Sequence, residues 1–276
     1  MRIPKTGPYL SLVVLSVVVW FTFPPLCAAG ESAENAADAA EVLEKYIEAT
    51  GGRSAYAALK TRVTKMKLEF KTMGFTANAT YFQARPGKSL LRLVGDPIGT
   101  FNEGALDGIA WELSSTGGPR LKVGAERAGA LRDAVLDGIL QWQNLFEKVE
   151  YAGSAAIEDR PCHKIVLTPK EGHPETRYYD RQTYMLVKRE CVIEHPMGLL
   201  QAELYLSDYR RADGVLLPFQ MRSTLAGDER LHTVSSIKHN IDFPDDLFAL
   251  PDEIKALLNR DDGPDASTTR EETARP

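Results

Sequence analysis

The feature that most constrains this chain is a change in the spacing of its apolar residues near residue 62. Before that point apolar residues recur at helical spacing, whereas after it apolar and polar residues alternate. The clearest stretch is 65–71, which reads Lys-Met-Lys-Leu-Glu-Phe-Lys. A period of two places successive side chains on opposite faces of a strand. Most of the chain should therefore fold into β-sheet with one apolar face.

Turn signals divide the alternating part into about a dozen strands. Pro86-Gly87, Pro196-Met197-Gly198 and Asp213-Gly214 are examples of these turns. Because successive strands are joined by short turns, we expect one large, curved, antiparallel sheet. The expected strands are 62–71, 77–84, 89–94, 99–105, 109–113, 147–152, 162–168, 175–180, 184–194, 199–209, 215–224 and 230–240.

Helical spacing is restricted to three segments. Residues 31–60 predict a helix that ends at Gly51-Gly52, followed by a short second helix. Residues 124–146 predict either one bent helix or two short helices divided near Gly138. Residues 251–258 predict a final capping turn or short helix.

The N-terminal segment 1–30 has the pattern of a signal peptide. Arg2 and Lys5 precede an apolar run that is too short to span a bilayer, and small residues follow it. We expect cleavage near Ala29 or Gly30, which removes two positive charges and changes the formal net charge from −5 to −7. Residues 31–258 should then form one exported, periplasmic domain, and the polar residues 259–276 a disordered tail.

Composition and motifs exclude several classes of function. With 33 Lys and Arg against 38 Asp and Glu, the chain has no excess of positive charge for binding nucleic acid. We find no nucleophile elbow, phosphate-binding loop, dinucleotide fingerprint or zinc-protease motif, and the five histidines are scattered. We therefore expect no enzymatic activity, no metal site and no cofactor. The expected register places Cys162 and Cys191 too far apart for a disulfide.

The candidate site is the apolar face of the sheet. The two longer helical segments, 31–60 and 124–146, cannot cover a dozen strands. The sheet must either close into a filled barrel or stay open and hold an apolar ligand under a helical lid. The candidate residues on the strands are Met66, Leu68, Phe70, Trp111, Met185, Val187, Leu204, Leu206, Phe219 and Met221, and those on the lid are Leu131, Val135, Ile139 and Trp142.

A series of short motifs resembles the outer-membrane lipoprotein-sorting protein family, which is related to LolA and LolB. The motifs, in order, are Lys45-Tyr-Ile-Glu-Ala-Thr-Gly-Gly52, Asp107-Gly-Ile-Ala-Trp-Glu112, Gly117-Gly-Pro-Arg-Leu121, Thr176-Arg-Tyr-Tyr-Asp180, Pro196-Met-Gly198, Ser207-Asp-Tyr-Arg210, Asp213-Gly-Val-Leu-Leu-Pro-Phe219, Asn240-Ile241 and Phe248-Ala-Leu-Pro251. The resemblance spans roughly residues 40–251.

This resemblance implies an incomplete antiparallel β-barrel with helices covering its concave face. It also implies a periplasmic carrier that binds the acyl chains of lipoproteins or other lipids and moves them toward the outer membrane. Its partners would be the lipid cargo and transfer proteins of the inner or outer membrane. The alternative is a periplasmic sensor or protein-interaction module built on the same scaffold.

Overall fold

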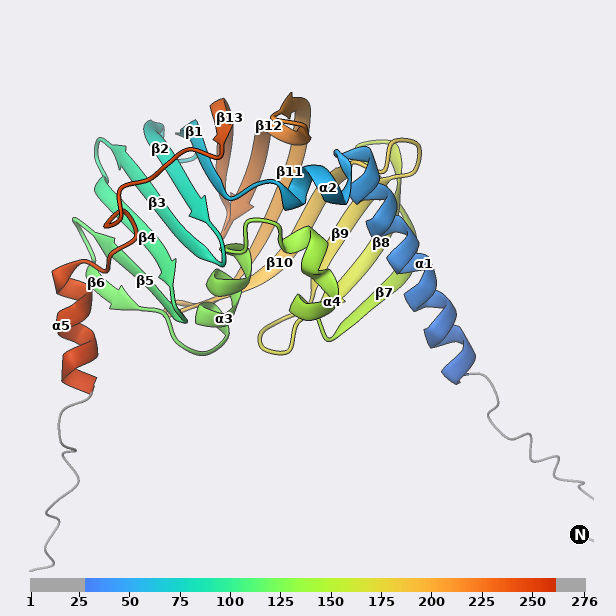
Figure 1. The fold of residues 1–276 in the computed structure, drawn as a ribbon, viewed down its shortest axis with the longest axis horizontal. Coiled ribbons are helices and arrows are strands. Elements are labelled where there is room, and N and C mark those ends of the chain that lie inside the picture. The colour runs from blue at the N-terminus through green and yellow to red at the C-terminus, as the bar shows by residue number, and fades with distance from the viewer. Residues whose placement is uncertain (1–27, 262–276) are drawn as a thin grey trace, which may run out of the picture.

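The main element of the computed structural model, which describes residues 28–261, is one antiparallel sheet of 13 strands. Its strand order is β6-β5-β4-β3-β2-β1-β13-β12-β11-β10-β9-β8-β7, so β1 and β13 meet near the middle and β6 and β7 are the edges (Figure 1). The strands are β1 (Thr61–Phe70), β2 (Phe75–Ala84), β3 (Lys88–Gly95), β4 (Gly99–Leu106), β5 (Ile109–Ser114), β6 (Gly118–Leu121), β7 (Lys148–Ile157), β8 (Arg160–Thr168), β9 (Glu175–Asp180), β10 (Leu186–His195), β11 (Gly198–Ala212), β12 (Val215–Leu225) and β13 (Asp228–His239).

The expected fold class is confirmed: the protein is mainly β, and its sheet curves without closing into a barrel. All twelve expected strands are present, and β6 is an additional one. The four residues of β6, Gly-Pro-Arg-Leu, are too few to show alternation. This strand is paired only with β5, which leaves it as one edge of the sheet.

The helices are short apart from the first. Between β6 and β7 the chain forms separate pieces, so the interpretation of a single bent helix was wrong. The break begins at Ala134, directly after α3 and four residues before Gly138. The helices are α1 (Ala28–Ala49), α2 (Gly52–Ala57), α3 (Gly124–Asp133), the 3₁₀ helix η1 (Gly138–Gln141), α4 (Trp142–Leu145) and α5 (Asp252–Asp261).

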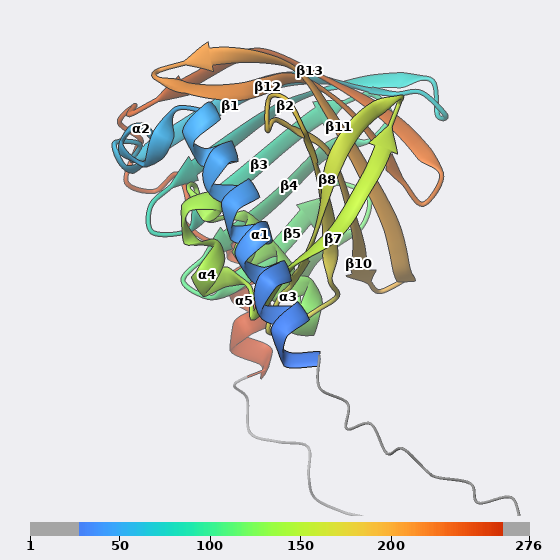
Figure 2. The same cartoon turned by 90° about the vertical axis from the view of Figure 1, so that its right-hand side faces the viewer.

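We call the face of the sheet that carries α1 and α3 the inner face. Helix α1 lies along the open side of the curved sheet and packs against β7 (Figure 2). Its residues Val42 and Leu43 join Ile165, Leu167 and Tyr179 in a buried cluster. Helix α3 contacts both β5 and β10. It therefore lies across the concavity between the two arms of the sheet, which are β1–β6 on one side and β7–β13 on the other. The helices thus fill part of the concavity.

The opposite, outer face is covered by the C-terminal segment. Helix α5 lies beside β6, at the other edge of the sheet from α1 (Figure 1). Ile254 of α5 is buried against Leu90 and Trp111, together with side chains of residues 247–250. The ring of Trp111 lies over Gly104, where any Cβ would come within 2.5 Å of it. This packing explains why a glycine occupies the middle of β4.

The two cysteines of the described residues are unpaired, as expected. Cys162 lies opposite Asp180 in the register of β8 and β9, whereas Cys191 lies far along β10. Burial raises the pKa of both thiols. Both are therefore protonated and unreactive near neutral pH.

The predicted signal peptide lies outside the described residues except for its last three, which begin α1. The predicted tail also lies outside them, apart from residues 259–261, which extend α5. Within residues 28–261, no helix combines the length and the apolar character needed to cross a membrane.

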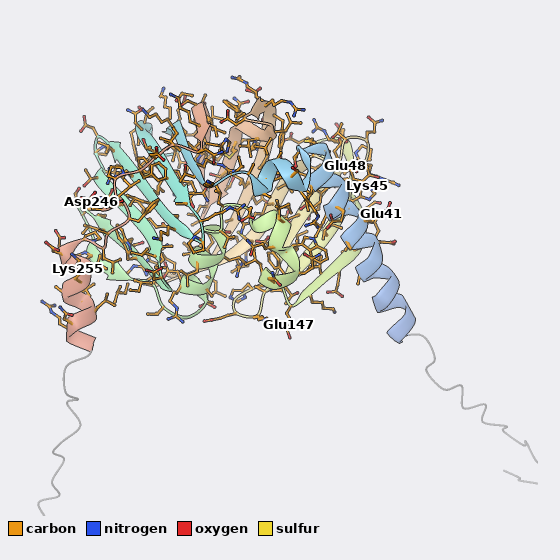
Figure 3. All side chains as sticks on the ribbon, viewed as in Figure 1. Glu41, Lys45, Glu48, Glu147, Asp246 and Lys255 are labelled. Carbon is orange, nitrogen blue, oxygen red and sulfur yellow. The ribbon has the colours of Figure 1, made fainter. Side chains whose placement is uncertain are left out.

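The packing of α5 leads to a stability prediction. Replacing Ile254, which is 0% exposed, by alanine leaves a cavity beside Trp111. Ile254→Ala should lower the free energy of unfolding by about 2–5 kcal/mol in urea denaturation. The control is Lys255→Ala at the neighbouring exposed position (Figure 3), which should change it by less than about 0.5 kcal/mol. Equal midpoints for the two variants would show that α5 is not docked on the sheet.

Candidate functional site

An apolar cluster occupies the inner face of β1–β4. Leu68 and Phe70 of β1 are buried against Ala77 and Ala79 of β2 and Leu93 of β3. The cluster continues through partly buried neighbours from β1–β4 and the turn after β3, which are Met66, Phe75, Leu91, Ile98 and Phe101. We call this set the inner apolar cluster. All of its members come from the sheet and its turns, so the described helices do not contribute to it.

The second arm of the sheet adds apolar residues to the same face. Leu206 of β11 lies opposite Met221 of β12, and Met221 lies opposite His232 of β13. His232 in turn lies opposite Leu68. Leu204 is two residues from Leu206 and therefore shares its face. The register thus brings six of the predicted strand residues onto the inner face, and these are Met66, Leu68, Phe70, Leu204, Leu206 and Met221.

Phe219 lies further along β12, with the guanidinium of the exposed Arg210 4.9 Å from its ring centre. Phe219 belongs neither to the inner apolar cluster nor to the row formed by Leu204, Leu206 and Met221.

The predicted lid residues lie in a separate place. Ile139 and Trp142 pack against the α1 cluster, and the Trp142 indole N–H donates to Glu44 at 3.4 Å. Leu131 lines a surface groove of about 310 Å³ between α3, α4 and the turn at 169–171. Val135 lies in the break between α3 and η1. Of the four, only Ile139 and Trp142 pack against the cluster that α1 forms with the sheet.

Three predicted residues are misplaced. Trp111 is on the outer face under α5, and Val187 packs on the outer face against Cys162 and Tyr178. Met185 precedes β10, where its carbonyl accepts a hydrogen bond from the Asp180 N–H at 2.9 Å. Alternation says that two residues share a face but not which face is inner. An irregularity in the register between Leu186 and Lys188 adds to this uncertainty.

Charged side chains hold α3 over the sheet. This helix has no buried residue. It is attached by Glu126, whose Oε2 lies 2.6 Å from the Arg120 guanidinium, and by Asp133, whose Oδ1 lies 3.2 Å from that of Arg189. Arg189 also bonds Glu175 at 2.6 Å. Alternation of apolar residues gave no signal for these positions, because it marks apolar side chains only.

Glu175 is the most strongly perturbed carboxylate of this network. It is 2% exposed and accepts hydrogen bonds from Arg177 and Arg189. Burial alone would raise the pKa of Glu175, but the two guanidinium groups outweigh burial and lower it to about 2. Glu175 is therefore ionised at neutral pH and structural in character. In residues 28–261, no three or more His, Cys, Asp or Glu side chains are grouped so as to hold a metal ion.

Comparison with known proteins relates this geometry to solved structures. No protein-family model matches the sequence, and no curated protein is significantly similar to it. A LolA superfamily protein from Nitrosomonas europaea superimposes with a TM-score of 0.54 at 14% identity, over 77% of this chain and 97% of that one. The chain has the LolA-like fold.

Two further structures agree with this assignment. An outer membrane lipoprotein-sorting protein domain from Vibrio parahaemolyticus gives a TM-score of 0.53 at 13% identity, over 82% of this chain and 100% of that one. A DUF1329 family protein from Desulfovibrio piger gives 0.53 at 12% identity, over 76% and 96%. Identities this low establish the LolA-like fold alone, so the resemblance found in the sequence is confirmed at the level of fold.

The Glu175 network makes stability depend on pH. Its pKa is near 4.5 when exposed and about 2 in the folded protein. The stabilisation is therefore fully present above pH 4.5 and is lost as the pH falls toward 2. Glu175→Gln should lower the free energy of unfolding at pH 7 by roughly 3 kcal/mol and flatten its dependence on pH between about 4.5 and 2. The exposed Glu147 (Figure 3) provides the control variant Glu147→Gln. Unchanged pH dependence in Glu175→Gln would contradict the assignment.

Proposed function

We propose that this protein is a periplasmic carrier that binds the acyl chains of lipoproteins or other lipids on its inner face and moves them toward the outer membrane. The observation that carries the proposal is the inner apolar cluster, which is built from β1–β4 and the turn after β3 and includes no side chain of the described helices. The LolA-like fold supports it, since lipoprotein sorting is the role stated for one of the structures that share this fold.

The physical driving force is the removal of methylene groups from water. Each buried CH₂ contributes about 0.8 kcal/mol, so one or two acyl chains bind firmly yet reversibly. The row formed by Leu204, Leu206 and Met221 adds apolar surface on β11 and β12, separated from the inner apolar cluster by His232 of β13. This row gives an acyl chain a longer surface to cover than the cluster alone.

A second candidate is a sensor or protein-interaction module. It is favoured by the hairpin between β10 and β11, where Met197 is 78% exposed and Leu199 is 61% exposed. Ile193, on the same hairpin, is also exposed. Exposed apolar residues gathered on one hairpin are typical of contact surfaces. A carrier could use such a hairpin as well, so the decisive experiment concerns the inner face.

The variants Leu204→Asp and Met66→Asp test the inner face. Both positions are partly buried, so a carboxylate there is tolerated better than in a closed core. We expect each variant to reduce the affinity for a fluorescent fatty acid at least tenfold, because the charge must be desolvated beside the chain. Val94→Asp, on the exposed opposite side of β3, is the matched control. Wild-type affinity in folded inner-face variants would refute this site.

The proposed function is tested directly by native mass spectrometry of the mature protein isolated from its own periplasm. A retained phospholipid or acylated peptide is expected. A mass that matches the bare polypeptide in repeated gentle preparations would overturn the carrier and favour the interaction module.

A further inference from the structure

The inner face of the central strands is polar at one end and apolar at the other. Along β1, Arg62 and Thr64 precede the apolar residues Met66, Leu68 and Phe70 on the same face. The neighbouring β2 repeats this order, because Gln83 lies opposite Arg62 and Tyr81 opposite Thr64, while alanines lie opposite Met66 and Leu68. Thr64 and Gln83 are buried. Two adjacent strands thus change from polar to apolar at the same level.

Arg62 has an unusual set of contacts at the polar end. Its Nε–H donates to Nε2 of His239 at 3.0 Å. Because Nε2 accepts this bond, the His239 proton is on Nδ1, which donates to Asp213 at 3.1 Å. His239 is therefore a neutral partner. Asp213 orients His239, and His239 in turn holds the Arg62 guanidinium by its Nε–H. The two terminal nitrogens of the guanidinium are not used by this chain of bonds.

The other arginines of the inner face are paired with carboxylates. Arg120 bonds Glu126, and Arg177 and Arg189 both bond Glu175. In contrast, within residues 28–261 no carboxylate oxygen lies within 4.0 Å of the Arg62 guanidinium. The carboxylate of Asp137 contributes to the field at Arg62 but is already held by Arg85 at 2.8 Å. Arg62 is thus a partly buried cation without an anionic partner.

A cation in this position favours an anion from outside the chain. Burial lowers the pKa of Arg62, which reflects the cost of keeping its charge away from water. Hydrogen bonds from a guanidinium to a carboxylate or phosphate are among the strongest in proteins. At ~3.3 Å per residue, Arg62 lies ~13 Å from Met66 and ~26 Å from Phe70 along β1. A ligand that satisfies both ends must therefore have a charged head and a long apolar tail.

We propose that the inner face binds an amphiphile with an anionic head group, a phosphate or a carboxylate, whose head pairs with Arg62 and whose acyl chain lies along the inner apolar cluster. This inference rests on the proposed function and specifies its ligand class. His239 and Asp213 act as positioning residues that hold Arg62 by its Nε edge and leave the terminal nitrogens to the ligand.

The test compares three ligands that carry the same palmitoyl chain. These are palmitoyl lysophosphatidate, palmitate and the uncharged monopalmitoylglycerol, each titrated below its critical micelle concentration by calorimetry. The wild-type protein should bind at least one anionic ligand about tenfold or more tightly than monopalmitoylglycerol, which corresponds to about 1.4 kcal/mol. The ranking of the two anions distinguishes a phosphate head from a carboxylate head.

Variants of Arg62 connect this preference to the residue. Arg62→Gln should abolish the preference for the anions while leaving the affinity for monopalmitoylglycerol within about twofold of wild type. Arg62→Lys keeps the charge but loses the planar fork, so it should retain part of the preference. The control is Arg92→Gln, which removes one positive charge from an exposed position on the outer face of β3. The Arg92 guanidinium lies 5.5 Å from the centre of the Phe82 ring. This variant should keep the full preference for the anionic ligands. Thermal unfolding of each variant confirms that it is folded.

The outcomes separate this inference from the proposed function. If the wild-type protein binds all three ligands equally, or if Arg62→Gln weakens all three alike, the head-group assignment is wrong while the carrier stands. If none of the three binds, the proposed function itself fails. If Arg62→Gln does not fold, the preserved preference expected for Arg92→Gln and the partial preference expected for Arg62→Lys still test the assignment.

Discussion

An open sheet of 13 strands must cover an apolar inner face without a second sheet to pack against, and the rest of this structure follows from that constraint. Helix α1 covers the face near one edge by apolar packing against β7 and its neighbours. Helix α3 reaches across the concavity and is attached to the sheet mainly by ion pairs, since no apolar residue of this helix is buried. The outer face has its own cover in α5. The inner apolar cluster on β1–β4 includes no side chain of the described helices.

The two kinds of cover differ in how readily they can be displaced. Separating α1 from the sheet would expose Leu43, Ile165 and Tyr179 to water, which is costly. Separating α3 exchanges ion pairs for hydrated charges, and the Asp133 side of its contact with Arg189 is already largely exposed. Arg189 is also paired with the buried Glu175 at 2.6 Å, so it has a second anionic partner besides Asp133. Helix α1 is therefore held by apolar burial, whereas α3 is held by the partly buried Glu126–Arg120 pair and the more exposed Asp133–Arg189 pair.

The sequence predicted the sheet well because alternation is a direct consequence of strand geometry. It failed where both faces of a strand are covered. Trp111 and Val187 are as apolar as Leu68, and only the tertiary positions of α5 and the β7–β8 hairpin reveal that they are on the outer face. Strand β6 was missed because it is too short to show a pattern.

The polar end of the candidate site could not be predicted from the sequence, for a different reason. Arg62 is a single charged residue at the start of a strand, where a solvated side chain is the ordinary expectation. Its partner His239 is 177 residues away, and their contact exists only through the pairing of β1 with β13. No local signal in either segment could have predicted this pair.

The pairing of β1 with β13 also determines at which stage of folding the candidate site can form. Strands β1–β6 and β7–β13 are each joined by successive local turns, so either half can begin to form as a meander of its own. The join between the halves pairs one of the first strands to be made with the last. Arg62 and His239 lie on opposite sides of this seam, as do Leu68 and Met221. A nascent or truncated chain that lacks β13 consequently has no continuous inner face, and the face proposed to bind the ligand is assembled only when β13 has been made and the two halves have joined.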